Sequence, residues 1–66
     1  MMKELSRTQW ENLIDEWILN QRDRALLKRR LLDGIIFEDL AEEFNLSVRQ
    51  TKRIVAQCTE KLIRHL

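Results

Sequence analysis

The chain has 66 residues, 35% of them charged, with a formal net charge of +1, one glycine, one cysteine and no proline. A chain of this length forms one domain, near the lower size limit for a hydrophobic core that folds without disulfide bonds or bound metals. The lone Cys58 excludes an internal disulfide. The composition favours helices over strands, so we expect a single all-α domain of about four helices over residues 1–66.

The first predicted helix covers residues 6–19. Its apolar stripe has the i, i+3, i+4, i+7, i+8 spacing of one helix face. The stripe consists of Trp10, Leu13, Ile14, Trp17 and Ile18. Two capping boxes compete for its start, Ser6 with Gln9 and Thr8 with Glu11. Two Trp side chains fit the core of so small a domain, with a surface for a partner or a second copy as the alternative.

The second predicted helix covers residues 23–33, with Asp23 as its cap. Its inward positions are Ala25, Leu26, Leu27, Leu31 and Leu32. Its cations are Arg22, Arg24, Lys28, Arg29 and Arg30. They either contact phosphates or form ion pairs with Asp23 and the acidic segment that follows. Gly34 is expected to stop the helix, and Ile35 and Ile36 to pass through the interior.

Residues 37–55 read as two helical arms joined by a corner. In the first arm, Leu40, Ala41 and Phe44 share one face. The solvent face carries Glu38, Asp39, Glu42 and Glu43. Asn45 tolerates the left-handed backbone conformation, so residues 45–47 can turn sharply without a glycine, with Leu46 filling the corner.

The second arm starts at about Val48, because Ser47 and Gln50 form a capping box. Its inner face carries Val48, Thr51, Val55, Cys58 and Leu62, with Ile54 at the edge. The opposite face carries Arg49, Arg53 and Gln57, flanked by Gln50 and Lys52. Arginine can fork onto guanine, glutamine can pair with adenine, and a helix start can hold a phosphate. We therefore assign base contacts to Arg49, Gln50 and Arg53, and backbone or flank contacts to Ser47, Lys52 and Gln57.

Asp33 and Gly34, followed by IIFEDLAEEFNLSVRQTKRIV, resemble the helix-turn-helix of region four of bacterial sigma factors and the related DNA-binding domain of response regulators. The shared pattern is a glycine, two acids, an apolar residue with alanine, a corner and a Ser-led recognition helix. It covers residues 23 to about 66. The sequence departs from it at Ile36, where the families have a hydroxyl cap, at Asn45, which replaces a glycine, and at Thr51, which replaces an apolar residue.

The resemblance implies a transcription regulator whose recognition helix enters the major groove of double-stranded, promoter-like DNA. The lone Cys58, with no membrane span or signal-peptide pattern, predicts a cytoplasmic location. We expect a stand-alone regulator of bacterial, phage or mobile-element type, because no segment for opening a promoter accompanies the motif. In the same families the helix before the two arms lies near the DNA backbone.

Beyond the motif, residues 56–66 are expected to extend the recognition helix to the chain end. A heptad-like seam runs along it at alternating four- and three-residue steps. The seam consists of Thr51, Val55, Cys58, Leu62 and His65 or Leu66. It either packs under the first helix or pairs two copies as a homodimer, which would suit DNA with two half-sites.

Other function classes find little support in the sequence. No Ser, Cys or His lies in a catalytic pattern, so we expect no enzyme, no cofactor and no metal. Neither a long apolar run nor a signal-peptide pattern occurs, and the polar face of the first helix is acidic, so no membrane partner is expected. The alternative function is a protein-interaction module that docks on RNA polymerase or a sigma factor without reading DNA.

Overall fold

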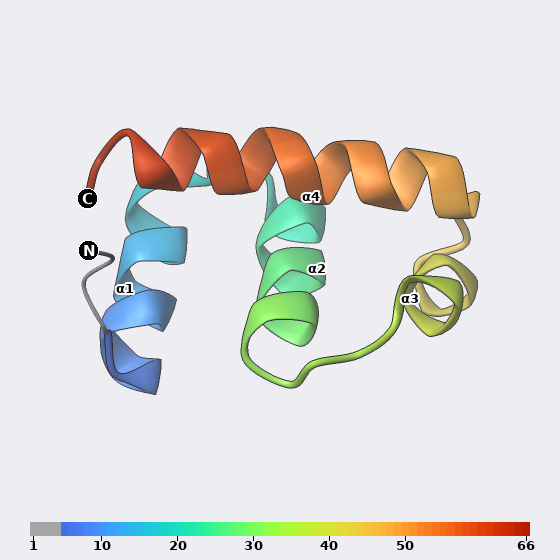
Figure 1. Ribbon diagram of the computed structural model, residues 1–66, viewed down its shortest axis with the longest axis horizontal. Helices are drawn as coiled ribbons and strands as arrows, with labels where there is room; N and C mark the ends of the chain where they lie inside the picture. The colour runs from blue at the N-terminus through green and yellow to red at the C-terminus, as the bar shows by residue number, and fades with distance from the viewer. Residues whose placement is uncertain (1–4) are drawn as a thin grey trace.

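Residues 5–66 are described by the computed structural model and form four α-helices. These are α1 (Arg7–Trp17), α2 (Gln21–Leu31), α3 (Phe37–Glu43) and α4 (Val48–Ile63). α4 runs along the length of the molecule across α1 and α2, and α3 packs near its N-terminal end (Figure 1). The predicted small all-α domain with an extended last helix is therefore confirmed. None of the described helices is both long and apolar enough to cross a bilayer.

The core forms where α4 crosses the other helices. Its central cluster consists of Ile14, Ile18, Leu26, Leu27, Val55, Cys58 and Leu62. Leu40 and Ala41 of α3 are buried as well. Each fully buried aliphatic side chain contributes about 1.5–3 kcal/mol, so these few positions carry much of the fold's stability. Trp10 and Trp17 are only half-buried at the edge of this cluster, although the sequence places them in the same stripe.

The start of α1 is fixed by the Ser6 and Gln9 capping box. The Gln9 N–H donates to Ser6 Oγ at 3.2 Å, and the Ser6 N–H donates to Gln9 Oε1 at 2.8 Å. The helix ends at Trp17, so the predicted end at residue 19 is wrong by two residues. Ile18 stays in the core as the C-cap, whereas Leu19 is 77% exposed in the linker to α2.

α2 begins two residues earlier than predicted because its cap is Asn20, not Asp23. The Asn20 side chain accepts the Asp23 N–H at 3.2 Å, which places Asp23 in the first turn. The helix buries Leu26 and Leu27. The prediction of Ala25 and Leu31 as inward residues is wrong, since Ala25 is exposed and Leu31 is 40% exposed. Leu31 lies in the last turn, at the end of α2 that points away from α4 (Figure 1).

Gly34 redirects the chain after α2 with a φ of 69°, a left-handed conformation that glycine adopts without steric cost. The Ile35 N–H then donates to the Arg29 carbonyl at 3.2 Å. The expected passage of Ile36 through the interior is wrong, because its side chain is 54% exposed. Ile36 instead occupies the N-cap position of α3, where it makes no side-chain capping bond.

α4 ends at Ile63, so the predicted continuation to residue 66 is wrong by three residues. The final residues turn back toward α1, where the His65 ring stacks on Trp17 with centroids 3.5 Å apart. The seam residues buried inside the domain are Thr51, Val55, Cys58 and Leu62. The seam therefore packs against the rest of its own chain, and pairing two copies through it would require opening the core.

Candidate nucleic-acid interface

The corner between α3 and α4 is a closed turn that fixes how α4 leaves α3. Asn45 adopts the expected left-handed conformation, with φ of 57°. The Leu46 N–H donates to the Ala41 carbonyl at 2.8 Å and the Asn45 N–H to the Glu42 carbonyl at 3.3 Å. This pair of bonds is the Schellman arrangement, which satisfies the last carbonyls of a helix. Leu46 is half-buried against the core, so the corner is anchored as predicted.

The N-terminus of α4 is held by the expected capping box. The Gln50 N–H donates to Ser47 Oγ at 3.0 Å, and the Ser47 N–H donates to Gln50 Oε1 at 3.0 Å. The box turns the carbonyl end of the Gln50 side chain toward the backbone. A glutamine that pairs with adenine uses its carbonyl and amide ends together, so Gln50 would have to leave the box to make that contact.

Thr51 is fully buried at the position where the resembling families have an apolar residue. Its hydroxyl donates to the Ser47 carbonyl at 2.9 Å, so the buried oxygen has a partner. The polar residue at this position therefore stays packed against the core.

The outer face of the first turns of α4 is exposed and cationic. The exposed side chains here are Arg49, Gln50, Lys52, Arg53, Ala56 and Gln57. Within residues 5–66, no carboxylate forms an ion pair with Arg49, Lys52 or Arg53. Arg49 and Gln57 are separated by about 12 Å along the axis.

Ala56 is the member of this face that the sequence interpretation missed. Its position follows from the helix period, because it lies three residues after Arg53 and four after Lys52. A small side chain on this face lets another molecule approach the helix backbone closely. The next acid along the face, Glu60, is held by Arg64 at 2.8 Å.

The cations of α2 differ from those of α4, because each one has a partner within the molecule. Three of them form ion pairs with carboxylates. These pairs are Arg22 with Asp23 at 3.2 Å, Lys28 with Asp15 at 2.8 Å and Arg29 with Glu43 at 3.1 Å. The hydrogen bond from Lys28 lowers the pKa of Asp15, and the one to Glu43 raises the pKa of Arg29.

The other two arginines of α2 donate to backbone carbonyls. Arg24 bonds the carbonyls of Asp15, at 2.9 Å, and Ile18, while Arg30 bonds that of Ile35 at 3.0 Å. Ion pairing with Asp23 or the acidic segment, one of the two roles left open by the sequence, thus holds for Arg22 and Arg29, whereas Lys28 pairs with Asp15 of α1, a partner that the sequence interpretation did not name.

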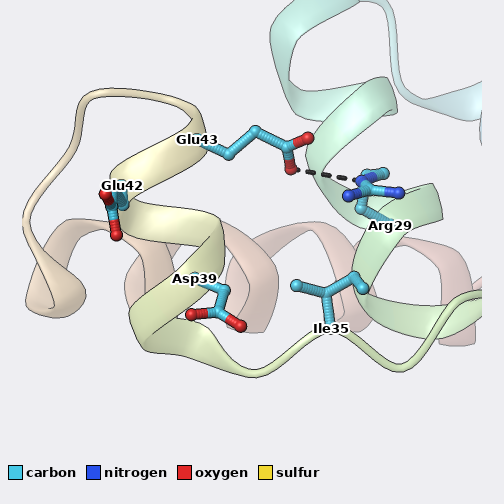
Figure 2. Close-up of a pocket in the computed structure, with 5 residues that line it drawn as sticks. All are labelled: Arg29, Ile35, Asp39, Glu42 and Glu43. Carbon is cyan, nitrogen blue, oxygen red and sulfur yellow. Dashed lines mark hydrogen bonds and ion pairs between the residues drawn. The ribbon is translucent and has the colours of Figure 1, made fainter.

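The acidic side of α3 borders a separate hollow of about 390 Å³ between α2 and α3. Its lining residues are Arg29, Ile35, Asp39, Glu42 and Glu43. Figure 2 shows Glu43 of α3 reaching to Arg29 of α2. The free carboxylates here would repel phosphates, so the hollow does not extend the cationic face of α4.

Cys58 is a free thiol that is 8% exposed, and burial raises its pKa. Residues 5–66 contain no group of three or more His, Cys, Asp or Glu side chains placed to hold a metal ion. Comparisons with protein-family models, curated proteins and solved structures gave no match. The functional assignment accordingly depends on the geometry of the α3 and α4 pair and its cationic face.

Proposed function

We propose that the domain binds double-stranded DNA in a sequence-dependent way and acts as a transcription regulator of the sigma region four type. The observation that carries the proposal is the distribution of unpaired charge. Arg49, Lys52 and Arg53 are exposed on one face of α4 without intramolecular ion pairs among the described residues. Since exposed cations on one helix face are the footprint of a nucleic-acid contact, the first turns of α4 are assigned to the major groove.

Within this interface the side chains have different roles. Arg49 and Arg53 point away from the core and read guanine edges, each good bidentate pair being worth about 1–3 kcal/mol of discrimination. Ser47 and the first amides of α4 hold a phosphate. Lys52 and Gln57 contact the DNA backbone or the bases that flank this site. Gln50 reads a base only after leaving its capping box, which makes its contribution conditional on the target sequence.

The test is selection of bound duplexes from a random DNA pool, followed by affinity measurements for the selected and a scrambled duplex at two salt concentrations. A preference on the order of a thousandfold or more is expected for the selected sequence. The double variant Arg49→Ala and Arg53→Ala should lose that preference. A matched control, Lys61→Ala with Arg64→Ala, removes the same charge from the far end of α4 and should retain it.

Circular dichroism and thermal unfolding show whether each variant keeps the fold. A folded Arg49 and Arg53 double variant that still selects the same motif would refute the base contacts. Weak wild-type binding that disappears with salt and selects nothing would refute sequence reading altogether.

The second candidate is a protein-interaction module for RNA polymerase or a sigma factor. It is supported by the acidic hollow beside α3, where Asp39 and Glu42 make no ion pair among the described residues. Such a partner would present a basic surface. Under this candidate the charge reversal Glu42→Lys should abolish binding to polymerase, and the Arg49 and Arg53 double variant should leave that binding intact. Under the DNA-binding proposal the arginine double variant should abolish function.

A further inference from the structure

Phe37, the first residue of α3, has a cation from α2 and a cation from α4 near its ring. Arg30 Cζ is 4.2 Å from the centroid of the Phe37 ring, and Lys52 Nζ is 5.7 Å from it. Both distances fall within the roughly 6 Å over which a ring attracts a cation. Phe37 is itself half-buried against the core, so the ring is a fixed support for two long side chains.

Arg30 retains unused hydrogen-bond donors. Its Nη1 donates to the Ile35 carbonyl at 3.0 Å, which fixes one edge of the guanidinium. A guanidinium has five N–H donors, so most of them are left for another acceptor. Its neighbour Arg29, in contrast, has its charge paired with the carboxylates of Glu43 and Asp33. Arg29 and Arg30 thus differ in the charge that each can offer to a ligand, a difference that could not be predicted from the sequence.

The position of the Phe37 ring links Arg30 to the cationic face of α4. Lys52 lies one helical step, about 100° around the axis, from Arg53, on the flank of α4 that faces α3. Arg30 of α2 reaches the same ring, so both cations lie beside the start of α3. The flank on the other side carries the neutral amides of Gln50 and Gln57. Of the two flanks of α4, the one beside α3 therefore carries the positive charge that a DNA backbone can contact.

We propose that Arg30 and Lys52, held by Phe37, form a clamp for a backbone phosphate on the strand that borders the groove on the α3 side. The clamp sets the register of α4 in the groove without reading a base. This inference rests on the proposed function, since it names a further contact of the same interface. A phosphate there would accept from the free N–H groups of Arg30 and from the Lys52 ammonium, and such charge-assisted bonds are the stronger class.

The test uses the full chain and the duplex selected by the wild-type domain. Arg30→Ala and Lys52→Ala should weaken binding to selected and scrambled duplexes by the same factor. Each should also lower the slope of log affinity against log salt, and the double variant should lower it by about 0.9, the value for the one phosphate that the two cations share. Arg29→Ala is the matched control, because it removes an equal charge from the adjacent position and should leave the slope unchanged.

Phe37→Leu tests the ring without changing any charge. It should weaken DNA binding, and Arg30→Ala should then cost less in the Phe37→Leu background than in the wild type, as coupled residues do in a double-mutant cycle. Arg30→Lys keeps the charge but not the planar fork, so it should retain the salt slope with reduced affinity. A change in stability alone would leave the salt slope of the folded fraction unaltered.

Two failures are distinguishable. If the wild-type domain selects a motif while Arg30→Ala and Arg29→Ala change the salt slope equally, the clamp is refuted and the proposed function survives. If the wild-type domain binds no duplex, both are refuted together.

Discussion

The uncapped start of α3 gives the sharpest test of how this sequence holds its fold. The caps of the other three helices, Ser6, Asn20 and Ser47, each accept a backbone N–H through the side chain, whereas Ile36 cannot. Ile36 already has the extended backbone of a cap, with φ of −70° and ψ of 155°. Ile36→Ser therefore adds an acceptor without moving the chain, and we expect the new hydroxyl to accept the Asp39 N–H.

Two opposing terms decide the outcome. Complete burial of an isoleucine is worth roughly 1.5–3 kcal/mol. Ile36 is 54% exposed, so removing its side chain should cost about 1 kcal/mol. A serine cap returns about 1 kcal/mol. Ile36→Ala loses the burial and gains no cap. We expect Ile36→Ser to match the wild type and Ile36→Ala to be less stable by about 1 kcal/mol.

Thermal and urea unfolding of the three proteins measure this difference. In a domain of this size, 1 kcal/mol corresponds to about 4–8 °C in Tm, which is well resolved. Ile36→Thr is a useful control, because it adds the hydroxyl while keeping the branched shape. Equal stability of the serine and alanine variants would show that the new hydroxyl makes no cap at the start of α3.

Three further outcomes can be measured on the same scale. Asn45→Gly should leave Tm nearly unchanged, whereas Asn45→Ala should cost about 1–2 kcal/mol because alanine resists the left-handed conformation; equal effects would contradict the role given to the corner. Thr51→Val should change the free energy of unfolding by less than about 1 kcal/mol, since the lost hydrogen bond and the gained methyl burial nearly cancel; a larger loss in urea unfolding would mean that the hydroxyl is essential to the start of α4. The Lys28 contact lowers the pKa of Asp15, so this carboxylate stabilises the fold above its unfolded pKa, and the contribution is lost as pH falls through the lower folded pKa. The Tm difference between wild type and Asp15→Asn should accordingly shrink between pH 7 and pH 3, and a constant difference would assign the effect to packing instead.

Local signals in the sequence were sufficient for the elements of the motif. The corner at Asn45 and the capping box of Ser47 depend on residues within a few positions of each other. Both can therefore be predicted from the sequence without knowing how the helices pack. The helix period likewise placed Thr51 and Val55 inward and Arg53 outward, as the structure has them.

The predictions that proved wrong concern contacts between helices, or choices that these contacts decide. Ile36 and Leu31 are apolar, but burial requires a neighbouring helix, and α4 does not cover those positions. The choice between Asn20 and Asp23 as a cap was open locally, because both side chains can accept a backbone N–H. Pairing of Lys28 with Asp15 and of Arg29 with Glu43 joins different helices, so no sequence spacing could have separated these cations from Arg30.

The low net charge sets a limit on how the proposed regulator can bind DNA. Non-specific affinity comes from cations that neutralise phosphates, and a large share of the cations in this domain are occupied by internal carboxylates. Even if Arg30, Arg49, Lys52 and Arg53 each neutralised a separate phosphate, the salt slope of one domain would be no steeper than about −3.6, far from the value near −10 of a large repressor. Binding to random DNA should therefore be weak, which makes the base contacts of Arg49 and Arg53 carry most of the discrimination. A measured slope much steeper than this would mean either that the internal ion pairs open on DNA or that more than one copy binds. The variant Arg29→Ala distinguishes these cases, because it lowers the slope only if the ion pair with Glu43 opens.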